Sequence, residues 1–208
     1  MAKRKTFVVS LNDIFEEKEI DFVFYSGFSI TQKQKSIESL HNAIKELYYD
    51  AEILEISSKS PIELGRKLSA FNLKLDSIAL ENIFQSSKVF EYGGPYEDLL
   101  SKTPIEAKKD PRIKDSGRII GFKYQGINYP TIPKTLFYDW MYCQAFYSDK
   151  ELMSLIINYD FFTDIEFNHE KSLNCQARSA AIFVSLYQKG LLEECLADIV
   201  KFEECVYN

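Results

Sequence analysis

Histidine, cysteine and long apolar runs are all scarce in this chain of 208 residues. It has 2 histidines and 4 cysteines, and no two cysteines form a Cys-x-x-Cys pair. Most zinc sites need such pairs or several histidines, so we expect no metal site and four reduced thiols. The first apolar run, Phe7-Val8-Val9, is too short for a signal peptide, and no run is long enough to cross a membrane. The expected location is therefore the cytoplasm.

Several familiar catalytic motifs are also absent. The patterns GxGxxG, GxxxxGKS or GxxxxGKT, HExxH and GxSxG do not occur. Their absence argues against nucleotide-dependent dehydrogenases, P-loop enzymes, zinc proteases and α/β-hydrolases. The 25 basic and 31 acidic residues give a formal net charge of −6, so binding of nucleic acid by bulk charge is not expected. A local basic patch stays open as a binding surface.

The patterns that are present predict one α+β domain over residues 1–208, mostly helical with a small sheet. Ser60-Pro61-Ile62-Glu63 and Thr103-Pro104-Ile105-Glu106 each place an N-cap residue before Pro and Glu, which is typical of a helix start. Strands are expected at 6–10, 21–26 and 52–57, with a hairpin at 118–124 and 127–129. Helices are expected at 32–49, 78–90, 134–147, 150–159 and 176–189, with a loop over 160–175 and a final helix after Gly190.

The most informative stretch is the predicted helix over 78–90. Glu81, Gln85 and Lys88 stand at i, i+4 and i+7, so a helix would place them on one face. A carboxylate, an amide and an amine in one stripe suit acid/base chemistry on a small polar substrate. The same stripe is also typical of a solvated helix face, and pattern alone favours that interpretation.

The order of segments around this helix resembles the NADAR (YbiA-like) family. Members carry an S-N-F-type segment, an E-H-Y-F-Q-A-x-K-F-type helix and a distal W-x-D segment followed by a G-K-N-like stretch. The corresponding segments here are Ser69-Ala70-Phe71, Glu81 to Phe90, Phe162-Thr163-Asp164 and Lys171 to Asn174. Asn82 stands where many members have His, and Phe162 replaces the tryptophan.

The resemblance is closer to NADAR proteins encoded beside DarT-type DNA ADP-ribosyltransferase toxins, and it covers about residues 25–195. It implies an antitoxin that removes ADP-ribose from guanine in DNA by cleaving the C–N bond at ribose C1′, without cofactor or metal. The shared stretches are 32–37, 56–61, 84–90, 107–112 and 137–140.

The resemblance also implies roles for individual residues. Glu81 would be the general acid/base, and Asp164 would orient the ribose hydroxyls or stabilise positive charge. Lys88 would either bind the pyrophosphate or attack C1′ to form a Schiff base. Ligand-binding roles are expected for Ser69, Phe71, Asn72, Gln85 and Asn174. Thr163-Asp164 could equally cap a turn.

Cationic residues would be needed to hold DNA. Lys59 is a further expected ligand-binding residue, because it precedes a predicted helix start, where a phosphate is favoured; a solvated turn is an equal alternative. Residues 101–123 hold seven basic residues against three acidic ones. We expect single-stranded, ADP-ribosylated DNA to contact this segment, chiefly through Lys108, Lys109, Arg112 and Lys114.

Two other functions remain compatible with the residues. One is a non-enzymatic antitoxin that blocks a cognate DarT-type toxin by binding it. The other is an N-glycosidase on a small ribosylated metabolite of the riboflavin-pathway type. Stoichiometry separates a blocker from an enzyme, and substrate preference separates the two enzymes.

Overall fold

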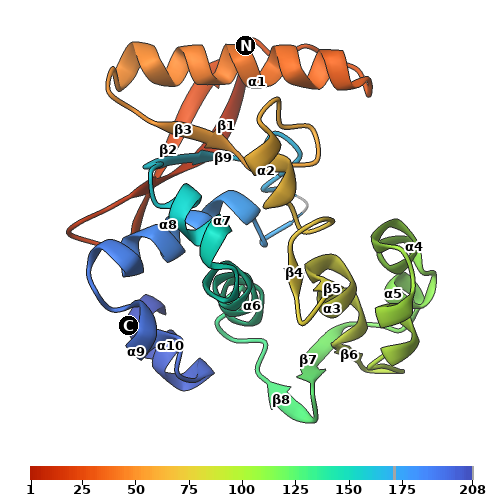
Figure 1. Ribbon diagram of the computed structural model, residues 1–208. Coiled ribbons are helices and arrows are strands. Elements are labelled where there is room, and N and C mark those ends of the chain that lie inside the picture. Colours follow the sequence, from red (N-terminus) through yellow and green to blue (C-terminus); the bar gives the residue numbers. More distant parts are fainter. Residues whose placement is uncertain (171, 208) are drawn as a thin grey trace.

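A four-stranded sheet lies between one long helix and a layer of helices in the computed structural model, which describes residues 1–170 and 172–207 (Figure 1). β1 pairs antiparallel with both of its neighbours, whereas β3 and β9 are parallel. The strands from edge to edge are β2 (Phe15–Phe22), β1 (Ala2–Val9), β9 (Phe161–Thr163) and β3 (Ile53–Glu55).

Alternation along the strands divides the core between the two faces of this sheet. Ile53 and Phe161 pack with α1 (Ile30–Leu47), which crosses the top of Figure 1. The next residues, Leu54 and Phe162, point the other way, into the larger core that contains α8 (Gln176–Gln188). Successive side chains of a strand point to opposite faces of the sheet, so a strand that is covered on both faces contributes to two cores.

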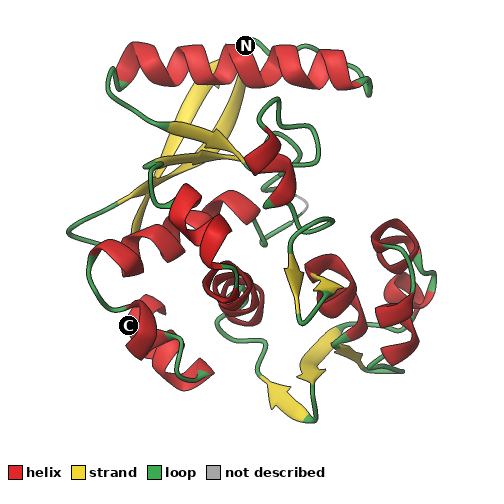
Figure 2. Cartoon of the chain, in the orientation of Figure 1, coloured by secondary structure: helices red, strands yellow, loops and turns green. Residues whose placement is uncertain are grey.

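The helical layer and a second half of smaller elements complete the fold (Figures 1 and 2). The layer beside α8 comprises α6 (Leu136–Ser148), α7 (Lys150–Ile156), α9 (Leu192–Cys195) and α10 (Ile199–Tyr207). The second half comprises α2 (Glu63–Lys67), β4 (Lys74–Leu75), β5 (Ile78–Ala79), α3 (Leu80–Ser86), β6 (Lys88–Phe90), η1 (Glu97–Ser101), α4 (Pro104–Lys109), α5 (Arg112–Asp115), β7 (Ile119–Tyr124) and β8 (Ile127–Tyr129). The predicted α+β class is confirmed.

Two local predictions are confirmed in detail. Thr103 caps α4, because its hydroxyl accepts from the Glu106 amide while the Glu106 carboxylate accepts from the Thr103 amide. The hairpin turns at Gln125-Gly126, where both residues have positive φ, and glycine tolerates that conformation at little cost.

Other predicted boundaries are wrong. The predicted helix over 78–90 ends at Ser86, and Lys88 lies on a strand. α2 begins at Glu63 without a side-chain cap, so Ser60 is not an N-cap; its hydroxyl accepts instead from the Ile62 amide. The predicted loop over 160–175 contains β9, and the final helix is divided into α9 and α10.

The expectation of four reduced thiols is also corrected. Cys195 and Cys205 form a disulfide, because α9 and α10 bring their Cα atoms to 6.0 Å. Cys143 and Cys175 are buried free thiols. Within the described residues, no helix has the length and apolar character needed to cross a membrane.

Candidate active site

A polar cavity of about 330 Å³ lies where α3 and β6 meet the loop between β9 and α8. It collects residues that are far apart in the chain, because Ala70 and Phe71 come from the segment after α2 and Tyr138 comes from α6. The ionisable side chains that line it are Glu81, Lys88, Lys108, Tyr138, Asp164 and Glu166.

Glu81, Gln85 and Lys88 form a hydrogen-bonded chain along one wall. Gln85 Nε2 donates to Glu81 Oε1 at 2.8 Å, and Lys88 Nζ donates to Gln85 Oε1 at 2.7 Å. All three residues are buried, at 6 to 8 % exposed. The solvated helix face is therefore excluded for this stripe, and the predicted grouping of the three side chains is present.

Local chemistry explains why the chain leaves the helix just before Lys88. The Ser86 and Ser87 hydroxyls both donate to the Ile83 carbonyl, an interaction that competes with helix continuation. β6 then pairs antiparallel with β7, placing Lys88 opposite Phe122. Lys88 thus enters the cavity from a strand rather than from the predicted third turn of a helix.

Among residues 1–170 and 172–207, no carboxylate forms an ion pair with Lys88. Its Nζ lies 4.5 Å from the centroid of the Phe84 ring, and its hydrogen-bond partner Gln85 is neutral. Burial lowers the pKa of Lys88 to about 8, with Glu81 opposing and Lys108 reinforcing that shift. About a tenth of Lys88 is therefore a neutral amine at pH 7, and the share grows as pH rises through about 8. A nucleophilic lysine requires this neutral form.

Asp164 supplies a second carboxylate to the cavity. Its Oδ1 accepts from the amides of Glu166 and Phe167 at 3.0 and 3.1 Å, and its Oδ2 accepts from Gln176 Nε2 at 2.9 Å. The side chain thus caps a turn, as one of the two predictions has it, and it also lines the cavity. Its predicted role toward the ribose stays a prediction. Burial, reinforced by the charge of Glu55, raises the pKa of Asp164 to about 7.

Glu55 lies behind the turn that carries Asp164. Its carboxylate accepts from Thr163 Oγ1 at 2.6 Å and from the Ile165 amide at 2.8 Å, so it binds the residues on either side of Asp164. His41 Nε2 lies 3.0 Å from the same Thr163 hydroxyl. Burial raises the pKa of Glu55 and lowers that of His41 to about 4.

Lys108 and Phe71 lie together at the edge of the cavity. Lys108 Nζ is 5.0 Å from the Phe71 ring centroid and 3.9 Å from Glu81 Oε1. Its side chain is 55 % exposed, so it joins the cavity to the protein surface. Asn82 helps to hold the segment leading to α4, because its Nδ2 donates to the Leu99 and Lys102 carbonyls at 2.7 Å.

Three predicted ligand-binding residues lie elsewhere. Asn72 Nδ2 donates to the Arg66 carbonyl and to Ser69 Oγ, so Ser69 and Asn72 stabilise the end of α2 instead of facing the cavity. Lys59 lies in the turn between β3 and α2, and it does not line the cavity. The backbone directs Phe71 to the cavity and its polar neighbours to the helix end.

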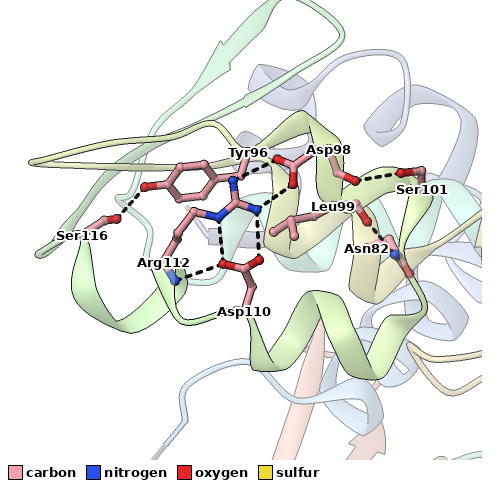
Figure 3. A network of polar contacts seen from close by, with 8 residues as sticks. All are labelled: Asn82, Tyr96, Asp98, Leu99, Ser101, Asp110, Arg112 and Ser116. Atoms are coloured by element: carbon pink, nitrogen blue, oxygen red, sulfur yellow. Dashed lines mark hydrogen bonds and ion pairs between the residues drawn. The ribbon is translucent and has the colours of Figure 1, made fainter.

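The predicted DNA-binding residues also separate. The Arg112 guanidinium binds Asp98 and Asp110 and stacks on the Tyr96 ring at 4.5 Å (Figure 3). Hydrogen bonds to Asp110 and Asp98 raise its pKa, and these carboxylates compete with any phosphate for it. Lys109 and Lys114 are exposed, and Lys108 belongs to the cavity.

No group of three or more His, Cys, Asp or Glu side chains within residues 1–170 and 172–207 is arranged to hold a metal ion. The cavity instead combines three carboxylates, one lysine with a lowered pKa and an aromatic ring at its edge. Such a set can protonate a leaving group, attack an electrophilic carbon and stack on a planar group.

The family model of DarT1-associated NADAR antitoxins matches residues 2–208. The chain belongs to this family. No curated protein matches it. The resemblance inferred from the sequence is thereby confirmed. The family supports a DarT-associated antitoxin role for the chain, with a cognate DarT-type toxin as its partner.

Several residues of the NADAR cavity escaped the sequence analysis. Gln176 binds Asp164 through Nε2, while its Oε1 accepts from the Ala70 amide and Tyr142 hydroxyl, so it joins three separate segments. Phe84 and Tyr138 also line the cavity, although apolar patterning marks both as core. Asn174 lines it as expected, and Lys171 in the same motif lies outside the described residues.

Proposed function

We propose that this NADAR antitoxin is a glycohydrolase that removes ADP-ribose from guanine in DNA. The observation that carries the proposal is the buried chain of Glu81, Gln85 and Lys88 in one cavity with Asp164. Cleaving an N-glycosidic bond requires a proton for the leaving nitrogen and an attacking group at C1′. Glu81 and Lys88 are suited to these two tasks.

The neutral amine of Lys88 attacks C1′, and the bond between C1′ and the guanine nitrogen breaks. Glu81 acts as the general acid and supplies the proton that this nitrogen takes up. Lys88 Nζ then loses two protons, one to the Glu81 carboxylate and one to the ribose ring oxygen, which opens the ring and leaves a Schiff base. One water adds at C1′, releasing ADP-ribose and free Lys88.

Asp164 orients the ribose hydroxyls in this proposal. Three hydrogen bonds to its carboxylate hold it in one position, and such pre-organisation favours a single substrate geometry. Phe71 stacks on a base beside Lys108, which meets the DNA or pyrophosphate charge at the edge of the cavity. The exposed Lys109 and Lys114 are then the residues that contact the strand.

The test is a turnover assay with enzyme at a small fraction of the substrate. The substrate is a single-stranded oligonucleotide carrying ADP-ribose on one guanine, and release of both products is measured. We expect many turnovers by the parent chain and none by Glu81→Gln, which keeps an acceptor for Gln85 but cannot act as a general acid. Release only from small ribosylated compounds would instead support a metabolite glycosidase.

A blocking antitoxin makes a different prediction in the same series. If the chain acts only by binding, toxin inhibition will be complete at one equivalent, and Glu81→Gln will inhibit as well as the parent chain. Turnover without toxin, lost in Glu81→Gln, would contradict the blocking alternative.

A further inference from the structure

A second cavity of about 660 Å³ adjoins the polar cavity. The two share four wall residues, so they are neighbouring compartments. The shared residues are Phe84, Ile119, Ser172 and Asn174. The second compartment contains neither Glu81 nor Lys88 nor Asp164, so the proposed cleavage does not occupy it.

The walls of the second compartment differ in chemistry from those of the first. Phe84 and Phe122 stack on each other with ring centroids 5.6 Å apart, and both line it. Ile132 and Leu173, which are 77 % and 57 % exposed, form apolar parts of its rim. The Phe122 ring also stacks against Phe137, so the accessible apolar surface is chiefly that of Ile132 and Leu173. Lys134, His169 and Glu170 line the same compartment. The apolar part of the wall suits the face of a nucleobase better than a sugar.

An unused hydrogen-bond acceptor lies where the compartments join. Asn174 Oδ1 is buried, and among the described residues it has no hydrogen-bond partner. A buried polar atom without a partner is costly, and it is often a position that a ligand completes. An amino group on the edge of a nucleobase is a donor of the required kind.

We propose that the second compartment holds a nucleobase of the substrate while the ribose to be cleaved lies in the polar cavity. This inference rests on the proposed function, since it gives a place to the part of the substrate that does not lie in the catalytic cavity. The base has two possible sources with the same chemistry. It is either the adenine of ADP-ribose or a base of the DNA strand beside the modified guanine.

The test uses unreactive probes, so that it does not depend on turnover. Binding of AMP, ribose 5-phosphate and an unmodified single-stranded oligonucleotide is measured by calorimetry for the parent chain and for Ile132→Ser/Leu173→Ser. Both side chains are exposed, so the variant should fold. Ile127→Ser is the matched control, because Ile127 is 56 % exposed on β8 and lines neither compartment.

We expect the double variant to weaken binding of a base-containing probe by about tenfold, with ribose 5-phosphate and the control unchanged. Weaker AMP binding alone would assign the compartment to adenine, and weaker oligonucleotide binding alone would assign it to the DNA strand. Equal affinities in variant and parent, or no binding of either probe by the parent, would overturn the proposal.

The same variant separates this inference from the proposed function. If the parent chain releases no ADP-ribose but the double variant still loses AMP or oligonucleotide binding, the nucleobase compartment stands without the glycohydrolase. If release by the double variant has an unchanged KM, the glycohydrolase stands without the compartment.

Discussion

Lys88 and Arg112 are two cations of the same half of the molecule with opposite surroundings. Arg112 is bound by two carboxylates and an aromatic ring at the surface, and hydrogen bonds to Asp110 and Asp98 raise its pKa (Figure 3). Lys88 is buried against a neutral amide, and burial lowers its pKa to about 8. The comparison teaches that the partners of a cation decide its use: carboxylates keep it charged and structural, whereas a neutral buried contact makes it available for chemistry.

The largest expected effect comes from removing Lys88. Lys88→Met should lower kcat at least about a thousandfold, because the attacking amine is lost. Lys88→Arg should be nearly as inactive if the amine attacks C1′, since a guanidinium keeps the charge but is not nucleophilic at neutral pH. Turnover is measured on the modified oligonucleotide, with exposed Lys74→Met as the control.

Borohydride treatment during turnover separates the two roles left open for Lys88. A Schiff base would be reduced to a stable adduct, which peptide mass spectrometry should locate at Lys88. Full activity in Lys88→Arg, together with no adduct in the parent chain, would leave Lys88 only the role of binding pyrophosphate.

Giving Lys88 a carboxylate partner should make it resemble Arg112. Gln85→Glu places a carboxylate within hydrogen-bond distance of Nζ, so the pKa of Lys88 should rise by about 1 unit or more. Because attack needs the neutral amine, activity in the parent chain should rise as pH increases through about 8, and the variant should need a higher pH. The measurement is kcat against pH. If the dependence of kcat on pH were the same in the variant, the rise of activity near pH 8 would not come from Lys88.

The buried carboxylates Glu55 and Asp164 allow a similar test, in which removing a neighbouring charge should lower a raised pKa. Asp164 has a raised pKa of about 7 because it is buried and because Glu55 lies near it. Glu55→Gln should lower the Asp164 pKa by about 1 unit, measured from its side-chain carbon signal by NMR. Thr163→Ser keeps the hydroxyl that donates to Glu55 and is the matched control. An Asp164 pKa still near 7 in Glu55→Gln would mean that burial alone sustains it.

This raised pKa also affects stability. The folded state holds a proton on Asp164 that the unfolded chain releases near its ordinary value of 3.8. The stabilisation is therefore complete below that value and is lost as pH rises through about 7. Denaturant unfolding between pH 4 and 7 should show this loss in the parent chain, and a smaller one in Glu55→Gln.

The smallest expected effect concerns Arg112. Arg112→Gln should lower Tm by roughly 1–3 °C, because its ion pairs are exposed and weak in water. About 1 M salt should reduce the difference, since exposed pairs are screened. Turnover should change far less than in Lys88→Met. A large loss of turnover at unchanged Tm would place Arg112 in DNA binding after all.

Signals within a few residues were enough to predict part of the fold. The capping box at Thr103 and Glu106 and the turn at Gln125-Gly126 are local, so their residues alone determine them. Ser60 has the same local pattern as Thr103, yet α2 starts at Glu63. There Gly65 packs so closely that an added Cβ would lie 1.9 Å from the Glu55 carbonyl. Tertiary packing against β3 overrides the capping signal.

In the candidate site, too, some contacts follow from local sequence and others depend on tertiary packing. Glu81 and Gln85 are one helical turn apart, so their contact follows from sequence spacing. Gln176 binds Asp164 and the Ala70 amide, which are 12 and 106 residues away in the sequence. No helical or strand spacing predicts contacts at these separations. Ser69 and Asn72 look like ligand-binding residues by resemblance, but hydrogen bonds to the end of α2 turn them away from the cavity.

The sequence by itself determined the NADAR family, the α+β class and the contact between Glu81 and Gln85, because these follow from the order of the motifs and from helical spacing. Only the tertiary structure decided that these side chains are buried, that β6 carries Lys88, and that Asp164 shares their cavity. Burial shifts the pKa values that the chemistry needs, and it depends on segments that meet only when the chain folds.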